Sequence, residues 1–368
     1  MTASLPTTQS AIVADATGDL IVAHDVPLPK LKPGLMLIRT VAVAVNPADV
    51  KMTGPMAATG CTAGGDCAGI VVAIGPGVPA GRFAIGDRVC APNLFMNPLE
   101  PRDGAFQEFI GVTADFTLKV PDSMPLEEAA ALGIGLITMG YALFRSLDIP
   151  GHPERPTEKP DVFVLVYGGS SASGTLAIQL IRRAGCIPIT TCSPRNFALV
   201  EAYGAQKAFD YHDPTCAEQI RAYTEDALDF ALDCYCHASS MEFCYKAIGR
   251  AGGRYTTLEP YPAHLHKRKR VKPEWLLGPA LVGREVGWKD PYHIKPDPEL
   301  RVFGVEWFKT AQRMLDRGEI KAHPIRVGNK VGLGGVLEGV EILRQGVLSG
   351  EKLVYRMGDW TSTPEVKP

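Results

Sequence analysis

A run of small residues directly after an apolar run is the segment best suited to chemistry. Residues 162–167 are all apolar or aromatic, as is typical of a strand buried on both faces of a parallel sheet. The turn 168–174 reads Gly-Gly-Ser-Ser-Ala-Ser-Gly, and a helix is predicted from Thr175 onward. Backbone N–H groups at such a turn can hold a pyrophosphate, so it predicts dinucleotide binding. A strand, turn and helix without a ligand would have a similar sequence.

The next predicted strand bears on which dinucleotide would bind. It covers 187–191, and Ser193 and Arg195 follow it. In NAD-binding units an acidic residue about 20 positions after the glycine turn holds the ribose 2′-hydroxyl. Residues 192–196 contain no carboxylate. Hydroxyl and guanidinium groups suit a 2′-phosphate, which predicts NADPH over NADH; the alternative is an ordinary surface arginine.

Composition excludes several classes of protein. The chain has 368 residues, 46% of them hydrophobic and 21% charged, with a net charge of −2. The charge argues against nucleic-acid binding, and no apolar run reaches the ~18 residues of a membrane span. Nine scattered cysteines and an N-terminus without signal-peptide features indicate a cytoplasmic protein with reduced thiols.

The order of predicted elements indicates an α/β protein in three parts. Residues 1–160 read as a β-rich domain that ends in a helical stretch from 127 to 147 and a proline-rich linker at 150–160. Residues 161–317 alternate strands and helices as in a doubly wound parallel sheet. Residues 318–368 return to short β-like runs. The strands expected in the middle part are 161–167, 187–191, 207–210, 228–234, 252–258 and 279–284.

This order resembles the medium-chain dehydrogenase/reductase superfamily. The resemblance is carried by Asn46-Pro47-Ala48-Asp49, the segments 81–89, 168–174 and 249–254, and Gly350-Glu351-Lys352-Leu353-Val354. It implies a GroES-like β-rich catalytic domain, a Rossmann domain with a doubly wound parallel sheet, a return of the chain end to the catalytic domain, and an active site in the cleft between the domains.

Longer segments resemble the fungal trans-acting enoyl reductases of polyketide biosynthesis, of the lovastatin-pathway type. They are residues 164–170, 191–194, 247–253 and 348–354. The resemblance implies hydride transfer from NADPH to the α,β-double bond of a polyketide acyl thioester. Two alternatives stay open, a stand-alone quinone or alkenal reductase and an NADPH-binding scaffold without activity.

The segments that hold catalytic zinc in other members of the superfamily lack the ligands here. Asn46-Pro47-Ala48-Asp49 occupies the cysteine segment, and Gly65 stands where a histidine would. Glycine has no ligand atom, so no metal site is predicted. Hydride addition to an activated double bond needs only enolate stabilisation and a proton.

By resemblance, the catalytic candidates are Lys51, whose ammonium would stabilise the enolate or deliver a proton, and Thr138, whose hydroxyl would contact the cofactor. The alternatives are a solvated or cofactor-anchoring lysine and an ordinary helical threonine. The implied cofactor contacts are Ala48, Asp49, Val50, Lys51, Ser170, Ser171, Ala172, Ser173, Ser193, Pro194, Arg195, Asn196, Tyr211, Leu258, Glu259, Lys352 and Leu353. The acyl pocket would be lined by Thr138, Met139, Gly140, Tyr141, Ala142, Leu143, Phe144, Pro279, Ala280, Leu281, Val282 and Gly283.

The implied partner is a polyketide synthase with an acyl chain on the phosphopantetheine of its acyl carrier protein. Residues 264–272 (His-Leu-His-Lys-Arg-Lys-Arg-Val-Lys) are the strongest basic run. They would suit docking of that anionic partner, or form a solvated loop or an import or nucleic-acid patch. The resemblance implies a monomer, and the proline-rich stretch 289–298 is expected to interrupt an edge of the Rossmann sheet.

Overall fold

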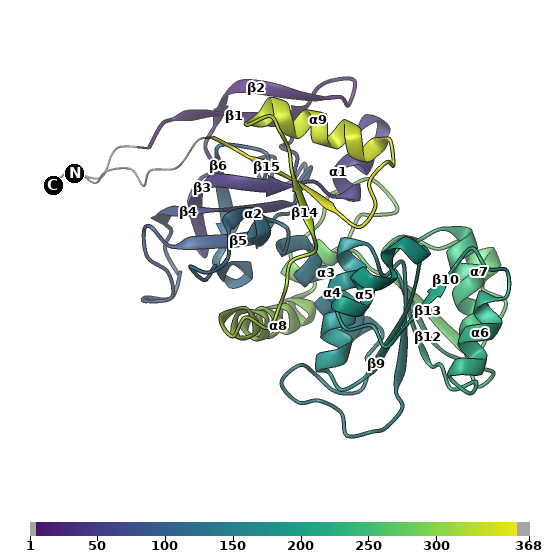
Figure 1. Cartoon of the computed structure of the whole chain (residues 1–368). Helices are drawn as coiled ribbons and strands as arrows, with labels where there is room; N and C mark the ends of the chain where they lie inside the picture. The colour runs from purple at the N-terminus through teal and green to yellow at the C-terminus, as the bar shows by residue number, and fades with distance from the viewer. Residues whose placement is uncertain (1–4, 359–368) are drawn as a thin grey trace. The chain divides into compact units, whose positions relative to one another are not determined.

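The computed structural model describes residues 5–358, and its contacts divide the chain into two compact units (Figure 1). Within this range, unit 1 comprises residues 5–134, 282–317 and 324–358, and unit 2 comprises residues 135–281 and 318–323. Among the described residues, no helix has the length and apolar character needed to cross a membrane. The predicted domain boundaries at 160/161 and 317/318 stay predictions.

Unit 1 is built on a seven-stranded sheet of order β14-β15-β3-β4-β5-β7, with β6 paired to β3. The strands are β3 (Leu35–Ala44), β4 (Asp66–Ile74), β5 (Arg88–Pro92), β6 (Phe109–Thr113), β7 (Leu118–Lys119), β14 (Ile325–Val327) and β15 (Lys352–Arg356). A two-stranded sheet joins β1 (Thr8–Ala14) to β2 (Leu20–Pro27). The pairing of Val354 with Ala44 attaches the C-terminal strand to the first domain's sheet, as the predicted return of the chain end requires (Figure 1).

The helices of unit 1 are short near the N-terminus and long near the C-terminus. They are α1 (Pro47–Lys51), α2 (Leu126–Ala130), α8 (Pro298–Asp316) and α9 (Leu333–Arg344), with 3₁₀ turns η1 (Gly54–Met56) and η2 (Ala114–Phe116). Helix α8 begins at Pro298, a residue suited to a first helical position, and the Asp297 side chain caps the Leu300 N–H at 2.9 Å. Its Gln312 exchanges two hydrogen bonds with the Lys119 backbone, which fixes α8 against β7.

Unit 2 contains the predicted doubly wound sheet. Its six parallel strands have the order β10-β9-β8-β11-β12-β13. The bounds are β8 (Phe163–Tyr167), β9 (Ile187–Cys192), β10 (Lys207–Asp210), β11 (Phe230–Asp233), β12 (Gly253–Thr257) and β13 (Val271–Trp275). The connecting helices are α4 (Ala172–Arg183), α5 (Phe197–Ala202), α6 (Cys216–Tyr223) and α7 (Ala238–Ala247), with 3₁₀ turns η4 (Pro194–Asn196) and η5 (Ala263–Leu265). Apolar residues of β8, β9, β11 and β12 pack with α6 and α7 in one core.

One sequence prediction about this region, the position of the sixth strand, is wrong. The sixth strand is β13 within the basic stretch, whereas 279–284 was expected; Gly278–Val282 is instead the 3₁₀ turn η6. The helical stretch expected from 127 to 147 is divided into α2, α3 (Gly133–Tyr141) and a π-turn, η3, at Ala142–Ser146. Gly133 is the first residue of α3, and a β-carbon there would overlap the backbone of Ala91, so glycine permits this close approach.

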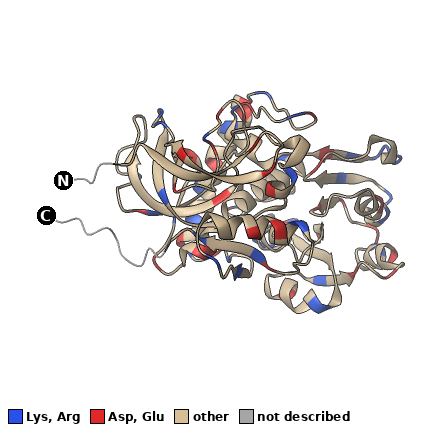
Figure 2. Ribbon diagram, turned by 90° about the horizontal axis from the view of Figure 1, so that it is seen from above, with Lys and Arg blue, Asp and Glu red and all other residues tan. Residues whose placement is uncertain are grey.

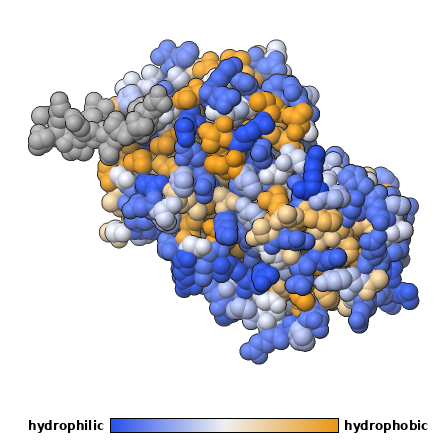
Figure 3. All heavy atoms as spheres, in the orientation of Figure 1, coloured by the Kyte–Doolittle hydropathy of each residue, from blue (hydrophilic) through white to orange (hydrophobic). Residues whose placement is uncertain are grey.

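Charged and apolar residues are mixed over the surface. Lysine and arginine on the one hand, and aspartate and glutamate on the other, are both scattered along the ribbon (Figure 2). On the face drawn in Figure 3, hydrophilic residues predominate and hydrophobic areas lie among them. A local excess of one charge therefore stands out against a balanced background.

Candidate functional site

The glycine-rich turn of unit 2 closes tightly on the neighbouring strand. Gly168 has a φ of +85°, and the N–H groups of Gly168 and Gly169 donate to the Thr191 carbonyl at 3.2 and 3.0 Å. A β-carbon on Gly169 would overlap the Thr190 side chain. Glycine is thus required at both positions, for the backbone angle at the first and for close packing at the second.

Ser171 caps the helix that begins at this turn. Its Oγ accepts the Gly174 N–H at 3.0 Å and donates to the Gly168 carbonyl at 2.8 Å. The first turn of α4 contains Ala172 and Ser173, and its N–H groups lie at the positive end of a twelve-residue helix. The structure thus brings Ser170 to Ser173 together where a pyrophosphate would bind, and their contact with it stays a prediction.

The residues after β9 form a polar group with one exposed cation. The Ser193 hydroxyl lies 3.3 Å from the Tyr211 hydroxyl, and Arg195 is exposed in η4. The acidic residue Asp210 ends β10, where the His212 side chain lies 2.7 Å from its carboxylate. The backbone N–H of His212 lowers the pKa of Asp210, so this carboxylate already has local partners. The group after β9 therefore offers hydroxyls and a guanidinium, which fit a phosphate.

A loop after β11, residues 233–237, was missed by sequence reasoning. Asp233 is buried, and its carboxylate accepts the N–H groups of Tyr235 and Cys236, both at 2.9 Å. It also accepts the hydroxyls of Ser240 at 2.6 Å and Tyr255 at 2.8 Å. Burial raises the pKa of Asp233, and these four donors oppose that effect. A carboxylate at the carboxyl end of a central parallel strand was the available signal.

This loop lies between the turn after β8 and the residues after β12 and contacts both. A β-carbon on Gly168 would lie 3.7 Å from that of Cys234, and the Leu258 N–H donates to the Cys236 sulfur at 3.3 Å. Strands β8, β11 and β12 are neighbours in the sheet, so their carboxyl ends meet. Leu258 and Glu259 thus lie at the same end of the sheet as the glycine turn, and their cofactor contact stays a prediction.

Thr138 lies on α3 beside η6. It is 8% exposed, and a β-carbon on Gly278 would overlap its hydroxyl, so glycine permits this close approach. The hydroxyl of Ser146, the last residue of the π-turn η3, lies 2.7 Å from the Thr256 hydroxyl and 2.8 Å from the Glu274 carboxylate. Nine of the predicted pocket residues are buried: Thr138, Met139, Gly140, Ala142, Leu143, Pro279, Ala280, Leu281 and Val282. Their role as a pocket stays a prediction.

Lys51, at the end of α1 in unit 1, contacts a segment distant in sequence. Its Nζ lies 4.4 Å from the centre of the Tyr292 ring, which is within the range of a cation–π interaction. Lys289 donates to the Pro55 carbonyl beside α1. The segment after η6 therefore packs against the helix that carries the predicted catalytic lysine.

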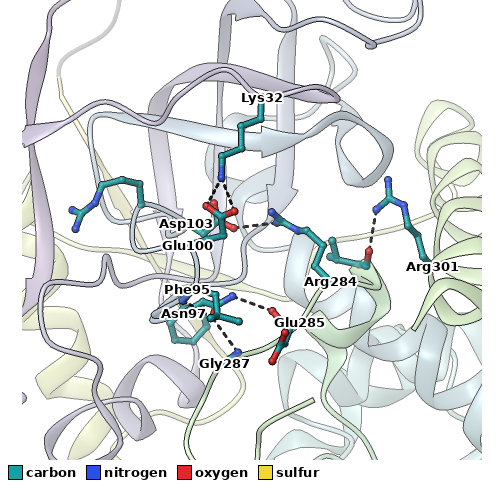
Figure 4. Close-up of polar contacts among 12 residues, drawn as sticks. Lys32, Phe95, Asn97, Glu100, Asp103, Arg284, Glu285, Gly287 and Arg301 are labelled. Carbon is teal, nitrogen blue, oxygen red and sulfur yellow. Dashed lines mark hydrogen bonds and ion pairs between the residues drawn. The ribbon is translucent and has the colours of Figure 1, made fainter. Parts of the chain in front are cut away.

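Polar contacts fix the same segment to the loop after β5 (Figure 4). Arg284 pairs with Asp103 at 3.0 Å, and Asn97 accepts the Gly287 N–H at 3.0 Å. The indole of Trp288 donates to the Phe95 carbonyl at 2.8 Å. The proline-rich stretch 289–298 thus belongs to unit 1 and does not directly follow the edge strand β13. This stretch therefore does not interrupt the edge of the Rossmann sheet and gives no support for a monomer.

Lys352 is directed into unit 1. Its Nζ lies 2.6 Å from Asp66 and 3.2 Å from the Ala131 carbonyl, with 6% of the side chain exposed. Asp66 is fully buried and also accepts the Asn46 side-chain amide at 3.0 Å and the Ile134 N–H at 2.6 Å. Sequence reasoning placed Lys352 at the cofactor and gave no signal for this ion pair.

The residues around Asp66 do not fit a zinc ion. The ammonium of Lys352 already contacts the carboxylate that would be a ligand. Burial raises the pKa of Cys67 to about 12, and its thiol already donates to the Ala91 carbonyl and accepts from the Asn93 amide. Zinc binds thiolates, imidazoles and carboxylates that are free to coordinate. Within residues 5–358, no three His, Cys, Asp or Glu side chains are grouped as metal ligands.

Comparison with known proteins identifies the class. Residues 32–122 match the alcohol dehydrogenase GroES-like domain, and residues 172–258 match the zinc-binding dehydrogenase family. The structure of CurK enoyl reductase has the same fold, with a TM-score of 0.70, 18% identity, and coverage of 96% of this chain and 100% of that one. The chain belongs to the medium-chain dehydrogenase/reductase superfamily, which implies a nicotinamide cofactor.

Two relatives narrow the family. Trans-enoyl reductase FSL5 of Gibberella zeae is 50% identical over 354 residues, which are 96% of this chain and 98% of that protein. Trans-enoyl reductase buaC of Petromyces alliaceus is 47% identical over 351 residues, or 95% and 98% of the two chains. The chain belongs to the fungal trans-enoyl reductases, and the resemblance stated from the sequence is confirmed.

Proposed function

We propose that this protein reduces the α,β-double bond of a polyketide acyl thioester with NADPH. Its membership of the trans-enoyl reductases, at 45–50% identity over nearly the whole chain, is the observation that carries this proposal. The thioester is held on the phosphopantetheine of an acyl carrier protein that belongs to a partner polyketide synthase.

The residues of this chain contribute binding and electrostatics. When bound, the reduced nicotinamide supplies a hydride to the β-carbon of the enoyl thioester. Lys51 provides an ammonium that stabilises the negative charge on the thioester oxygen. It also holds a proton at Nζ that could pass to the α-carbon, which would complete the saturated product. Thr138 holds the nicotinamide through its hydroxyl.

The choice of NADPH rests on the group after β9. Arg195 and the hydroxyls of Ser193 and Tyr211 bind the 2′-phosphate, because a guanidinium pairs with phosphate oxygens. Michaelis constants for NADPH and NADH test this choice. A preference for NADH would reject it.

An activity assay tests the reaction. Purified protein is given NADPH with crotonyl or longer enoyl pantetheine thioesters, and separately with quinones. Oxidation of NADPH by the thioesters alone is expected. Oxidation by quinones alone would support the stand-alone quinone reductase. Tight NADPH binding without oxidation by any acceptor would support a scaffold.

We also propose that the acidic surface of the partner docks at a basic pocket in unit 2. The pocket has a volume of about 690 Å³. It is lined by Arg221, Glu242, Tyr245, Lys246, Arg250, Leu265, Lys267 and Arg268. Arg268 has a structural role, since it donates to the carbonyls of Ile248 and Gly249 at 2.8 and 2.6 Å. Lys246, Lys267 and Arg250, which lies 3.6 Å from Asp226, are exposed cations that can attract an anionic partner.

Charge reversal tests the docking pocket. The triple variant Lys246→Glu, Arg250→Glu and Lys267→Glu is expected to raise the Michaelis constant for carrier-bound substrate and to spare a pantetheine thioester. Reversal of Lys207, Lys309 and Lys330 gives a matched control. Equal effects on the two substrates would reject docking at this pocket. The cytoplasmic location and the monomeric state stay predictions from the sequence.

A further inference from the structure

Four buried polar side chains of unit 1 form one connected group, which we call the Lys352 cluster: Asn46, Asp49, Asp66 and Lys352. Their side chains are 7%, 1%, 0% and 6% exposed. The Asn46 amide donates to Asp66 at 3.0 Å, and the Asn46 N–H donates to Asp49 at 2.7 Å. The cluster therefore joins the start of α1 to the first residues of β4 and β15.

The cluster holds more negative than positive groups. Lys352 is the one cation paired within it, at 2.6 Å from Asp66, and Asp49 is a second carboxyl group. Among the described residues, the Asp49 Oδ1 is one of three buried side-chain polar atoms without a hydrogen-bond partner. Burial raises the pKa of Asp49 to about 7, and the charge of Asp66 adds to that effect. The ammonium of Lys352 opposes it, so removal of Lys352 would leave the two carboxyl groups uncompensated.

Helix α1 depends on this cluster for its position. It has only five residues, too few to be stable from its own hydrogen bonds. Asp49 is its third residue and accepts the N–H that precedes the helix, while Lys51 is its last. Asp49, a member of the cluster, is thus only two positions before Lys51, the lysine proposed to face the thioester.

We propose that Lys352 is a positioning residue, whose buried ammonium holds Asp66 and α1 so that Lys51 is presented for enolate stabilisation. This inference rests on the proposed function. The ammonium supplies the fixed positive charge among these carboxyl groups. Because this cation is a side chain of β15, the carboxyl groups of the cluster need no metal ion as a counter-charge. The same side chain couples the C-terminal strand to α1, the helix that carries Lys51.

The test compares four variants. Lys352→Met removes the ammonium, Lys352→Arg keeps a cation, and Lys352→Met with Asp66→Asn removes both charges without leaving one unpaired. Lys330→Met is the matched control, since Lys330 forms an exposed pair with Glu338 at 2.8 Å in the same unit. Measurements are kcat and KM with an enoyl pantetheine thioester, NADPH affinity, the melting temperature, and amide hydrogen exchange of residues 46–53.

We expect the double variant to melt near the wild-type temperature and to bind NADPH normally. Its kcat should fall about 10- to 100-fold, which is the usual loss when a group that only orients a functional residue is removed. Exchange in residues 46–53 should rise in the double variant and not in Lys330→Met, and Lys352→Arg should recover part of kcat. A folded double variant with wild-type kcat and exchange would overturn the proposal.

Two readouts separate this inference from the proposed function. If wild-type protein reduces no enoyl thioester, the proposed function fails, while exchange of residues 46–53 still tests the positioning of α1. Elemental analysis and a chelator address the metal. Stoichiometric zinc, with a melting temperature that falls on chelation, would overturn the view that an ammonium provides the charge.

Discussion

The glycine turn of unit 2 and the Lys352 cluster of unit 1 reach a fixed geometry by opposite means. The turn uses backbone groups and small side chains within seven consecutive residues, 168–174. The cluster uses charged side chains whose paired members, Asp66 and Lys352, are separated by 286 positions. A turn built from neighbours is sensitive to added volume, whereas a cluster built from distant charges is sensitive to loss of one partner.

Removal of Asp66 should have the largest effect. Asp66→Ala leaves the Lys352 ammonium buried without its carboxylate, which we expect to cost about 3–5 kcal/mol of unfolding free energy. Urea denaturation followed by tryptophan fluorescence measures the change. The control is Glu338→Ala, which breaks the exposed pair with Lys330 and should cost no more than about 1 kcal/mol. Equal costs would show that burial of the pair is unimportant.

The pH dependence of the unfolding free energy also distinguishes the two regions. The glycine turn contains no titratable group, whereas the Lys352 cluster contains Asp49. Burial raises the pKa of Asp49 from its ordinary value of 3.8 to about 7. Between these values the folded protein binds more protons than the unfolded chain, so this contribution to stability falls as pH rises and levels off above about 7. Asp49→Asn should remove that slope and be most stabilising, relative to wild type, at alkaline pH.

Unfolding free energies at about pH 5 and about pH 8 measure the slope. Asp66 and Lys352 are the charged groups that act on Asp49, so in Lys352→Met the fall should extend to higher pH and be larger in total. Identical pH profiles for wild type and Asp49→Asn would rule out Asp49 as the titrating group.

Added volume tests the turn. A β-carbon on Gly174 would overlap the Gly168 carbonyl and Gly169, so Gly174→Ala should displace the turn. We expect a cost of about 1–3 kcal/mol and weaker nucleotide binding, measured by cofactor fluorescence. Gly334→Ala in α9 is the matched control, because no atom lies within 4 Å of its added β-carbon. That variant should keep or slightly raise stability.

The smallest change concerns cofactor preference. Arg195→Ala should raise the Michaelis constant for NADPH about tenfold and leave that for NADH nearly unchanged, because only the 2′-phosphate contact is lost. Arg182→Ala, on the surface of α4, should change neither constant. A similar loss with both cofactors would place Arg195 away from the 2′-phosphate.

The sequence was sufficient where local pattern decides the structure. The apolar run before Gly168 and the small residues after it predicted β8, the turn and α4 in the right order. It failed for β13, because Lys272 and Glu274 give that edge strand a polar pattern. It also failed for the Lys352 cluster, since no local pattern shows which buried carboxylate a lysine 286 positions away will meet.

Strand β13 also has a consequence for how copies of this protein meet. It is the last strand of its sheet, and it carries Lys272, Pro273 and Glu274 in its centre. The proline has no backbone N–H, and the charged residues on either side of it are poorly suited to a sheet interface. A strand of a second molecule would therefore find few partners for backbone hydrogen bonds along this edge. Continuous sheets running from one molecule into the next are thereby discouraged, both in the finished enzyme and while it folds at high concentration.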